Sequence, residues 1–305
     1  LLKFGTNIIN EIRGIFSIVY FDLKGNTIEC IRDFTGTKPL YYLLENNNFF
    51  FSSEAWFLYS LTQKKINKKS LNFFLNFGFS PEENTLILGV KKIKPRNIIK
   101  FNFKNIKIEN KEYFNIDENK NTELITKNQI NNSLEEAVKI NLITDTKIGT
   151  FLSGGLDSST ITVLAKKYND QIEGFTTVYR PEKKYEKYNL DFKFSKRLSE
   201  DLDIKLNVNY IDNISSALDD FYKVTSYLDE PVSNLNLLNT YWQSKHANLL
   251  NFKVILTGDG SDELFCGYDR YHKIFLSNYL KVFNIINRKI NKYNSLKKID
   301  IPLFF

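Results

Sequence analysis

Methionine is absent from this 305-residue sequence, and cysteine and histidine occur only twice each. Cys30 and Cys266, and likewise His246 and His272, lie too far apart in the sequence for the ligand spacing of a zinc site. So few cysteines favour a reducing compartment, and we expect the protein in the cytoplasm. Without a methionine, Leu1 is not expected to be the encoded start, which predicts a processed chain or a fragment.

Long apolar runs are missing as well. None approaches the roughly 20 residues that a membrane span needs, and Lys3, Glu11 and Arg13 interrupt the region where a signal peptide would have its apolar core. The net charge of +7 arises from 42 basic and 35 acidic residues that are interspersed, which indicates solvated surface rather than a nucleic-acid partner. We therefore expect a soluble protein that binds neither a membrane nor nucleic acid.

The first part of the chain has the pattern of an antiparallel, β-rich domain. Residues 15–31 hold two runs of alternating apolar and polar residues around a turn, which predicts a hairpin, and residues 49–52 add a strand. A polar, acidic stretch at 112–121 predicts a domain boundary. We therefore expect an α+β domain over residues 1–120 and a second domain over residues 121–305.

Strands and helices alternate in the second domain. Apolar residues repeat at helical spacing in some segments and form short β-branched runs in others, which predicts a doubly wound, parallel α/β sheet. The predicted helices begin near Ile130 and Leu156 and cover residues 194–202, 214–228 and 236–250. The predicted strands end at Leu152 or cover residues 172–178, 205–211 and 252–257.

A turn with the composition of a phosphate site lies at Gly149–Thr160, which reads G-T-F-L-S-G-G-L-D-S-S-T. Gly154 and Gly155 lie between a predicted strand and a predicted helix, and because they lack a Cβ they allow a tight turn there. Backbone N–H groups, the positive end of that helix and the serine hydroxyls would together bind an anion. Asp157 beside a phosphate implies a divalent cation between them. The alternative is a tight turn capped by its serines.

A second glycine-rich loop follows another β-branched strand at Val254–Tyr268, which reads V-I-L-T-G-D-G-S-D-E-L-F-C-G-Y. It carries Asp259, Asp262 and Glu263. Because parallel strands end at the same edge of a sheet, where open α/β folds bind their ligands, we expect the two loops to meet there. The alternative for Asp262 and Glu263 is an acidic pair that interacts with a helix dipole.

The two loops together resemble the paired signatures of the glutamine-dependent asparagine synthetase family, in S-G-G-L-D-S-S and G-D-G-S-D-E-L-F-x-G-Y. The first domain resembles the second half of a class II glutamine amidotransferase at Arg13–Ser17, Arg32–Tyr42 and Phe51–Glu54, with packing and turn chemistry as the alternative. The resemblance implies an amidotransferase-like domain followed by an ATP pyrophosphatase domain, truncated at both ends. The family's nucleophilic cysteine has no counterpart in residues 1–305. Cys30 is expected to be buried, and this chain is not expected to hydrolyse glutamine.

The resemblance also implies roles for individual residues. Asp259 stands where most asparagine synthetases have glutamate, and it would support the intermediate and take a proton from attacking ammonia. The other roles are pyrophosphate binding by Ser153, Gly154, Gly155, Asp157, Ser158 and Ser159, Mg²⁺ binding by Asp157 and Asp262, and binding of the adenosine of ATP by Phe151, Thr177, Thr257 and Gly258.

Three other positions matter for the comparison with the family. Asp229-Glu230-Pro231 resembles a run that shapes the family's substrate pocket, and the alternative is a helix that stops before proline. Pro95-Arg96 stands where the family has proline and glycine, a change that affects a turn. Cys266 also replaces a family glycine, and there we expect packing.

The reaction that the resemblance implies converts aspartate, ATP and ammonia to asparagine, AMP and pyrophosphate through β-aspartyl-AMP. Ammonia would normally come from glutamine, and a homodimer is the candidate oligomeric state. Two alternatives stay open. One is the same adenylating chemistry on another carboxylate, in β-lactam or peptide ring closure or in amidation of a sugar acid, and the other is a non-catalytic nucleotide-binding remnant.

Overall fold

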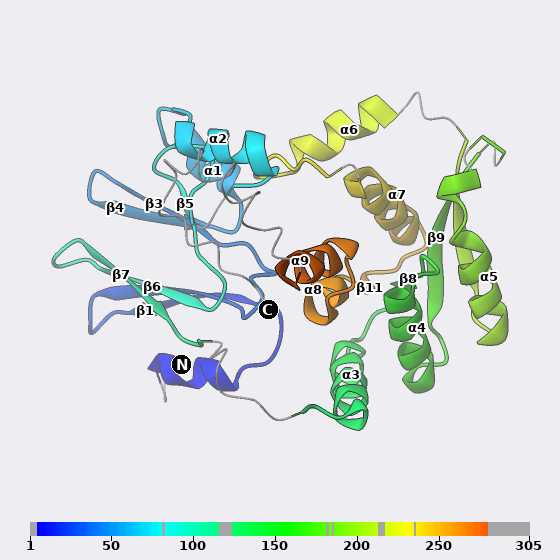
Figure 1. Ribbon diagram of the computed structural model, residues 1–305. Helices are drawn as coiled ribbons and strands as arrows, with labels where there is room; N and C mark the ends of the chain where they lie inside the picture. The colour runs from blue at the N-terminus through cyan, green and yellow to red at the C-terminus, as the bar shows by residue number, and fades with distance from the viewer. Residues whose placement is uncertain are drawn as a thin grey trace. The chain divides into compact units, whose positions relative to one another are not determined.

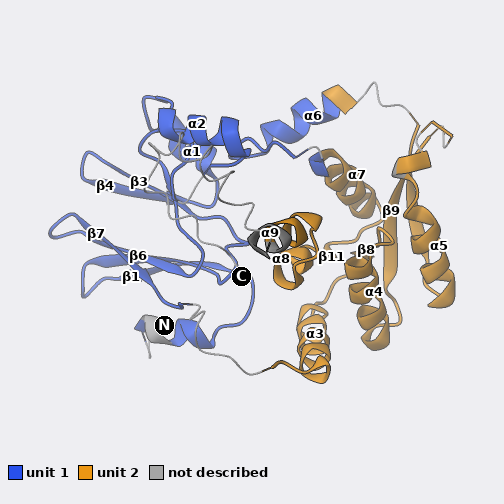
Figure 2. Ribbon diagram, viewed as in Figure 1, with its two compact units in different colours: residues 1–120, 219–237 blue, residues 121–218, 238–305 orange. Residues whose placement is uncertain are grey.

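The computed structural model describes residues 5–80, 83–115, 124–180, 183–184, 186–212, 217–234 and 236–279. Part of the predicted boundary at 112–121 and the start of the helix predicted at 214–228 lie outside these residues. Within the described residues, no helix is both long enough and apolar enough to span a bilayer. The chain forms two compact units, and Figure 2 colours residues 1–120 and 219–237 blue and residues 121–218 and 238–305 orange.

The first unit contains a four-stranded antiparallel sheet with the strand order β1-β2-β6-β7 (Figure 1). β1 (Ser17–Asp22) and β2 (Thr27–Arg32) pair along their whole length and confirm the predicted hairpin. β6 (Asn97–Asn102) and β7 (Lys107–Glu112) extend the sheet. Side chains alternate between the two faces of a strand, so β2 and β6 bury two separate cores: Ile28, Cys30, Ile99 and Phe101 lie in one, and Ile31 and Ile98 lie in the other.

A second sheet in the same unit has three strands in the order β4-β3-β5. These strands are β4 (Asn48–Ser52), which was predicted at 49–52, β3 (Tyr41–Glu45) and β5 (Lys91–Lys92). The helices of this region are the 3₁₀ helix η1 (Gly5–Glu11), α1 (Ala55–Ser60) and α2 (Lys68–Phe77). Asn67 caps α2 by accepting hydrogen bonds from its first amides, and Gly78 ends it in the left-handed conformation. The unit also contains most of α6 (Ala217–Ser226).

The second unit is built on a parallel sheet with the strand order β10-β9-β8-β11. The strands are β8 (Ile148–Phe151), β9 (Glu173–Tyr179), β10 (Leu206–Ile211) and β11 (Val254–Leu256). The helices are α3 (Lys127–Asn141), α4 (Leu156–Tyr168), η2 (Glu186–Tyr188), α5 (Phe192–Asp201), α7 (Asn236–Leu249), α8 (Ser261–Phe265) and α9 (Asp269–Tyr279). The predicted alternation of strands and helices is confirmed.

Helices cover both faces of this sheet, as the doubly wound prediction requires. Ile148 of β8 packs in one core with Val138 of α3 and Ala165 of α4. The neighbouring strand residue of opposite orientation, Ile255, packs instead with Phe175 and Ala247 of α7. Because successive strand residues point to opposite faces, these two cores lie on opposite sides of the sheet. The predicted fold class is therefore confirmed.

The structure explains two of the departures from the family pattern. Arg96 has φ of 59° and Cys266 has φ of 57°, a left-handed conformation that glycine adopts at little cost. The interpretation of Cys266 as packing was wrong, because this cysteine is exposed and ends α8. At both positions the left-handed backbone conformation explains why the family has glycine.

Candidate active site

The first glycine-rich turn joins β8 to α4 without a side-chain cap on the helix. Gly155 is the N-cap residue of α4, and no side chain accepts a hydrogen bond there. Gly154 has φ of 94°, and a Cβ at this position would overlap the carbonyl oxygen of Asp191 and lie 3.0 Å from the amide nitrogen of Ser195. The turn thus packs directly on the first residues of α5. The uncapped amides of a 13-residue helix are suited to bind an anion.

Serine hydroxyls gather at this helix start. The Oγ atoms of Ser153 and Ser158 lie 2.9 Å apart, and the Ser158 hydroxyl donates to the carbonyl of Gly155 at 3.2 Å. Ser153 Oγ accepts from the amide of Gly155 at 3.3 Å. Two of the predicted hydroxyl groups therefore face each other at the turn. The same bonds stabilise the turn itself, as the alternative of a serine-stabilised turn requires.

The second glycine-rich loop packs against the first. β11 and β8 are parallel neighbours, with Leu256 opposite Thr150, so their following loops leave the same edge of the sheet. A Cβ added to Gly258 would stand 2.8 Å from the amide nitrogen of Ser158 and 2.9 Å from Asp157. Only glycine allows this approach without displacement of the backbone. The predicted meeting of the two strand ends is therefore confirmed.

The carboxylates of the two loops lie close enough to affect one another. Burial, followed by the negative charges of Asp262 and Glu263, raises the pKa of Asp157. Tyr268 donates its hydroxyl to Glu263 Oε1 at 2.8 Å, and this bond is the largest of the effects that raise the pKa of Tyr268 to about 12. Asp157 and Asp262, which are 105 positions apart in the sequence, thus place their negative charges at the same edge of the sheet.

The carboxylates of the two loops are suitable ligands for a divalent cation. Burial and like charges raise the pKa of Asp157 without an opposing cation, and carboxylate oxygens are suitable Mg²⁺ ligands. Over the described ranges, no group of three or more His, Cys, Asp and Glu side chains has the arrangement of a metal centre. Mg²⁺ commonly uses only one or two carboxylates and takes its other ligands from water and substrate phosphate. The residues therefore suit a cation that arrives with a phosphate.

The predicted adenosine residues lie on β8, on β9 and in the loop that follows β11. Thr177 of β9 is buried, and its hydroxyl has no hydrogen-bond partner among the described residues. Phe151 is partly buried and packs against the core that contains Phe175. Thr257 Oγ1 accepts from the amide of Asp259 at 3.5 Å, and Asp259 itself is exposed. A buried hydroxyl without a partner is costly, which makes Thr177 a candidate ligand contact.

A cavity of about 610 Å³ lies at the carboxyl end of β9, a feature that the sequence did not reveal. Its apolar and charged lining consists of Val178, Lys183, Glu186, Asn189, Leu190, Phe192 and Lys193. A second cavity of about 430 Å³ lies at the amino ends of the strands and includes Ile148, Ile172 and Phe252. The larger cavity thus lies at the carboxyl ends of the strands, where open α/β sheets bind ligands, but its lining includes no residue of the two glycine-rich loops.

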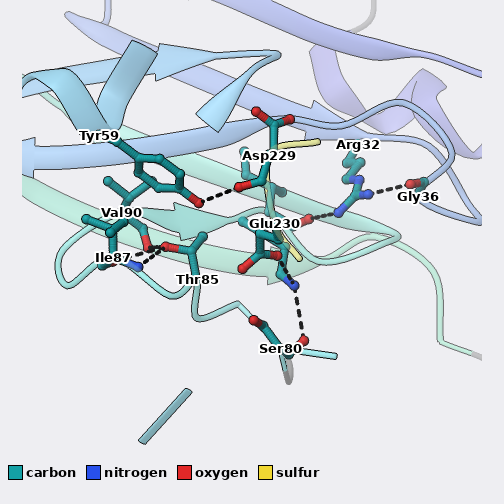
Figure 3. Close-up of polar contacts among 11 residues, drawn as sticks. Arg32, Gly36, Tyr59, Ser80, Thr85, Ile87, Val90, Asp229 and Glu230 are labelled. Atoms are coloured by element: carbon teal, nitrogen blue, oxygen red, sulfur yellow. Dashed lines mark hydrogen bonds and ion pairs between the residues drawn. The ribbon is translucent and has the colours of Figure 1, made fainter. Parts of the chain in front are cut away.

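In the first unit, two of the residues that carry the amidotransferase resemblance, Arg32 (Figure 3) and Asp33, hold the backbone that follows β2. Arg32 donates to the carbonyls of Ile93 at 2.6 Å and Lys38 at 2.9 Å, and Asp33 accepts from the amides of Thr37 and Lys38 at 2.9 Å each. The contacts of this pair are those of packing and turn chemistry. Cys30 is fully buried in β2, as predicted, and burial raises its pKa to about 12, which excludes a reactive thiolate.

Known families match both units. The family model described as asparagine synthase matches residues 129–299, and the glutamine amidotransferase domain matches residues 1–114. Asparagine synthetase [glutamine-hydrolyzing] 1 of Bacillus subtilis is 27% identical over 279 residues, which are 87% of this chain and 41% of that protein. Putative asparagine synthetase [glutamine-hydrolyzing] 2 of Methanocaldococcus jannaschii is 28% identical over 311 residues, which are 94% and 57% of the two chains.

A relative with a different name also matches. Amidase chry2 of Gibberella zeae is 24% identical over 307 residues, which are 90% of this chain and 43% of that protein. The chain spans about half the length of the curated relatives that it matches.

Proposed function

Because the chain belongs to the asparagine synthase family, we propose that it carries the ATP-binding half of a ligase that forms an amide from a carboxylate and ammonia. In this proposal residues 1–120 are an amidotransferase-like domain and residues 121–305 an asparagine synthase domain. The acceptor is aspartate, the products are asparagine, AMP and pyrophosphate, and ammonia normally comes from glutamine. The setting is cytoplasmic and the oligomer a homodimer.

One observation carries the proposal: the backbone contact of Gly258 with Asp157 and Ser158. It joins a loop with the composition of a phosphate site to a loop that holds Asp259 and Asp262. A turn stabilised only by its serines would not need a second loop packed against it. If Asp262 interacted only with a helix dipole, its charge would not need to raise the pKa of Asp157, as it does. A site that activates a carboxylate needs both an anion cradle and carboxylates at one place.

The residues of the first loop would hold the departing pyrophosphate. The uncapped start of α4 supplies amides, and Ser153, Ser158 and Ser159 supply hydroxyls next to the glycines 154 and 155. Asp157 and Asp262 would hold Mg²⁺, which when bound neutralises charge on the phosphates as the α–β bond breaks.

Adenosine would lie between the second loop and β9. The backbone of Phe151, Thr257 and Gly258 and the buried hydroxyl of Thr177 border this region. Asp259 is exposed on the loop between β11 and α8. From there it would support the acyl-adenylate and accept a proton from ammonia as nitrogen attacks the activated carbonyl carbon and AMP leaves.

Pyrophosphate release tests the proposal. Purified protein that contains residues 1–305 should release pyrophosphate from ATP when aspartate and Mg²⁺ are present, and should turn over repeatedly only when ammonia is added. Asp157→Asn should abolish the release, whereas Asp170→Asn should retain it, because the side chain of Asp170 is 96% exposed beyond the other end of α4. Retention of ATP binding and of its Mg²⁺ dependence in Asp157→Asn would instead favour a nucleotide-binding remnant.

The relative named as an amidase favours a second candidate, in which the same adenylating site takes another carboxylate. Screening carboxylates in the same assay separates the two candidates. Release of pyrophosphate with another acid and none with aspartate would replace the first proposal by the second.

A further inference from the structure

The helix α8 is too short to fix the direction of its own acidic side chains. It has five residues, none of them buried, and no side chain caps its first amides. Leu264 and Phe265 are 77% and 54% exposed, so they contribute little apolar packing. Asp262 and Glu263 nevertheless lie close to Asp157, because their charges, after burial, are the causes that raise its pKa. The groups that hold these two carboxylates must therefore lie outside α8.

Gly267 lies directly against the carboxylate of Asp262. The chain turns back after α8 through Cys266, whose φ of 57° is left-handed. The amide of Gly267 then donates to the main-chain carbonyl of Asp262 at 3.0 Å. A Cβ added to Gly267 would overlap Asp262 Oδ1 and would lie 3.1 Å from its Cγ and 3.4 Å from its Cα. The backbone of the returning chain therefore limits the directions that this carboxylate can take.

Tyr268, the next residue, holds Glu263. Its hydroxyl donates to Glu263 Oε1 at 2.8 Å. The guanidinium carbon of Arg270 lies 4.2 Å from the ring centroid of Tyr268 and 5.5 Å from that of Tyr271, and the two rings are 5.6 Å apart. Glu263 is exposed, whereas Tyr268 is half-buried and has these contacts on its ring. The tyrosine is thus the better fixed partner, and it directs the carboxylate.

We infer that Gly267 and Tyr268 are positioning residues, which hold Asp262 and Glu263 near Asp157 before any ligand binds. Like charges repel, so acidic side chains on an exposed helix would otherwise turn toward solvent. Carboxylates that already have one direction lose little side-chain entropy when a cation binds to them. This inference rests on the proposed function, in which Asp157 and Asp262 hold Mg²⁺ against the pyrophosphate group of ATP.

The geometry at Gly267 favours this role over a requirement of the turn itself. Its φ lies outside the left-handed range, so the backbone conformation does not call for glycine. The nearest atoms to an added Cβ belong to the carboxylate of Asp262, which can rotate away. Alanine should therefore be compatible with the fold and should displace the carboxylate. The missing side chain at position 267 determines the direction of Asp262.

Gly267→Ala tests the inference in protein that contains residues 1–305, with Cys266→Ala as the matched control. Calorimetry would measure the Kd of ATP with Mg²⁺ and with EDTA. Gly267→Ala should raise the Kd with Mg²⁺ about tenfold, because loss of groups that orient metal ligands commonly costs 10–100-fold in affinity, and should change the Kd with EDTA by less than about twofold. Cys266→Ala should change both by less than about twofold, because Cys266 is exposed and only its side chain differs.

Tyr268→Phe removes the hydroxyl that holds Glu263 and keeps the ring next to Arg270. It should raise the Kd of ATP with Mg²⁺ about fivefold, less than Gly267→Ala does, because Glu263 is not one of the two candidate ligands. Tyr271→Phe is the control, since this tyrosine lies in the same ring cluster. It should leave the Kd within about twofold. If Gly267→Ala fails to fold, Tyr268→Phe and its control decide the question.

A double variant shows whether Gly267 acts through Asp262. Asp262→Ala removes the carboxylate that Gly267→Ala displaces, so the second substitution should then change the Kd with Mg²⁺ by less than about twofold. A structural role of Gly267 would instead give additive effects in the double variant. Thermal unfolding of the single variant should show a Tm within a few degrees of the parent, about the shift of 1 kcal/mol.

Four results separate the outcomes. An equal effect of Gly267→Ala with Mg²⁺ and with EDTA, or additive effects with Asp262→Ala, would overturn the inference. So would equal Kd values for Tyr268→Phe and Tyr271→Phe. Unmodified protein that binds ATP equally well with Mg²⁺ and with EDTA would overturn both the inference and the proposed cation site. Binding that depends on Mg²⁺ and shows the expected effects, but without pyrophosphate release, would support the inference and reject the proposed reaction.

Discussion

The backbone of Gly258 touches the first turn of α4 so closely that a Cβ would stand 2.8 Å from the amide nitrogen of Ser158. Backbone atoms on both sides leave no flexible side chain that could move aside. The two glycine-rich loops can therefore pack this closely only because Gly258 has no side chain.

Gly258→Ala should separate the two loops. Overpacking of this kind costs about 1–3 kcal/mol of stability, and displacement of reacting groups by about 1 Å can lower the rate 100-fold. We expect pyrophosphate release to fall about 100-fold and the free energy of unfolding to fall by about 1–3 kcal/mol. Gly155→Ala should lower pyrophosphate release and the free energy of unfolding by less. The φ of Gly155 is −71°, and the nearest non-neighbouring atom is 3.5 Å from the new Cβ. An equal loss in both variants would contradict this account.

Asp157→Asn should stabilise the ligand-free protein while it removes activity. Burial and the charges of Asp262 and Glu263 raise the pKa of Asp157 in the folded protein above its ordinary value of 3.8. A raised carboxyl pKa favours folding when the group is protonated, so this contribution is fully present below pH 3.8 and is lost as the pH rises through the folded pKa. The variant should thus gain less than about 1 kcal/mol at pH 7 and nothing near pH 3.

Thermal unfolding of the two proteins at pH 3 and pH 7 measures this difference. Raised salt at pH 7 should reduce it, since part of it arises from repulsion between partly exposed charges. Pyrophosphate release should fall about 100-fold or more, because neutralisation of phosphate charge contributes several kcal/mol to such reactions. A variant less stable than the parent at pH 7 would contradict the role of repulsion.

Glycine should be more stable than alanine at position 96, because Arg96 has a left-handed backbone conformation. At φ of 59° an L residue carries a cost of about 1–2 kcal/mol that glycine does not. Arg96→Gly and Arg96→Ala both lose the ion pair with Glu112 at 3.5 Å and the stacking over Phe34, so their difference reports the backbone alone. Arg96→Gly should be the more stable by roughly 1 kcal/mol in denaturant unfolding. At the exposed strand residue Lys111 the order should reverse, with alanine more stable than glycine by about 0.5–1 kcal/mol.

The sequence predicted those parts of the fold that depend on local periodicity. The hairpin of β1 and β2 and the strands β8 to β11 follow from runs whose pattern is complete within a few residues, and the meeting of two strand ends follows from parallel topology. Contacts between distant segments were not predictable in this way. Asp229 meets α1 across 174 positions, and neither its acidity nor Pro231 indicates the partner. Lys183 and Lys193, which line the larger cavity, are two among many lysines and carry no signal of their own.

The two cysteines should differ sharply in reactivity. Cys30 is fully buried in β2, and burial raises its pKa to about 12, so almost no thiolate forms near pH 8. Cys266 is exposed at the end of α8. Native protein containing residues 1–305 should therefore react with a thiol reagent such as Ellman's reagent at Cys266 within minutes and at Cys30 only after unfolding. Cys266→Gly should abolish the fast phase and keep the fold, since glycine suits φ of 57°. Rapid modification of Cys30 in the native protein would show that β2 opens readily, and it would contradict the assignment of Cys30 to the core.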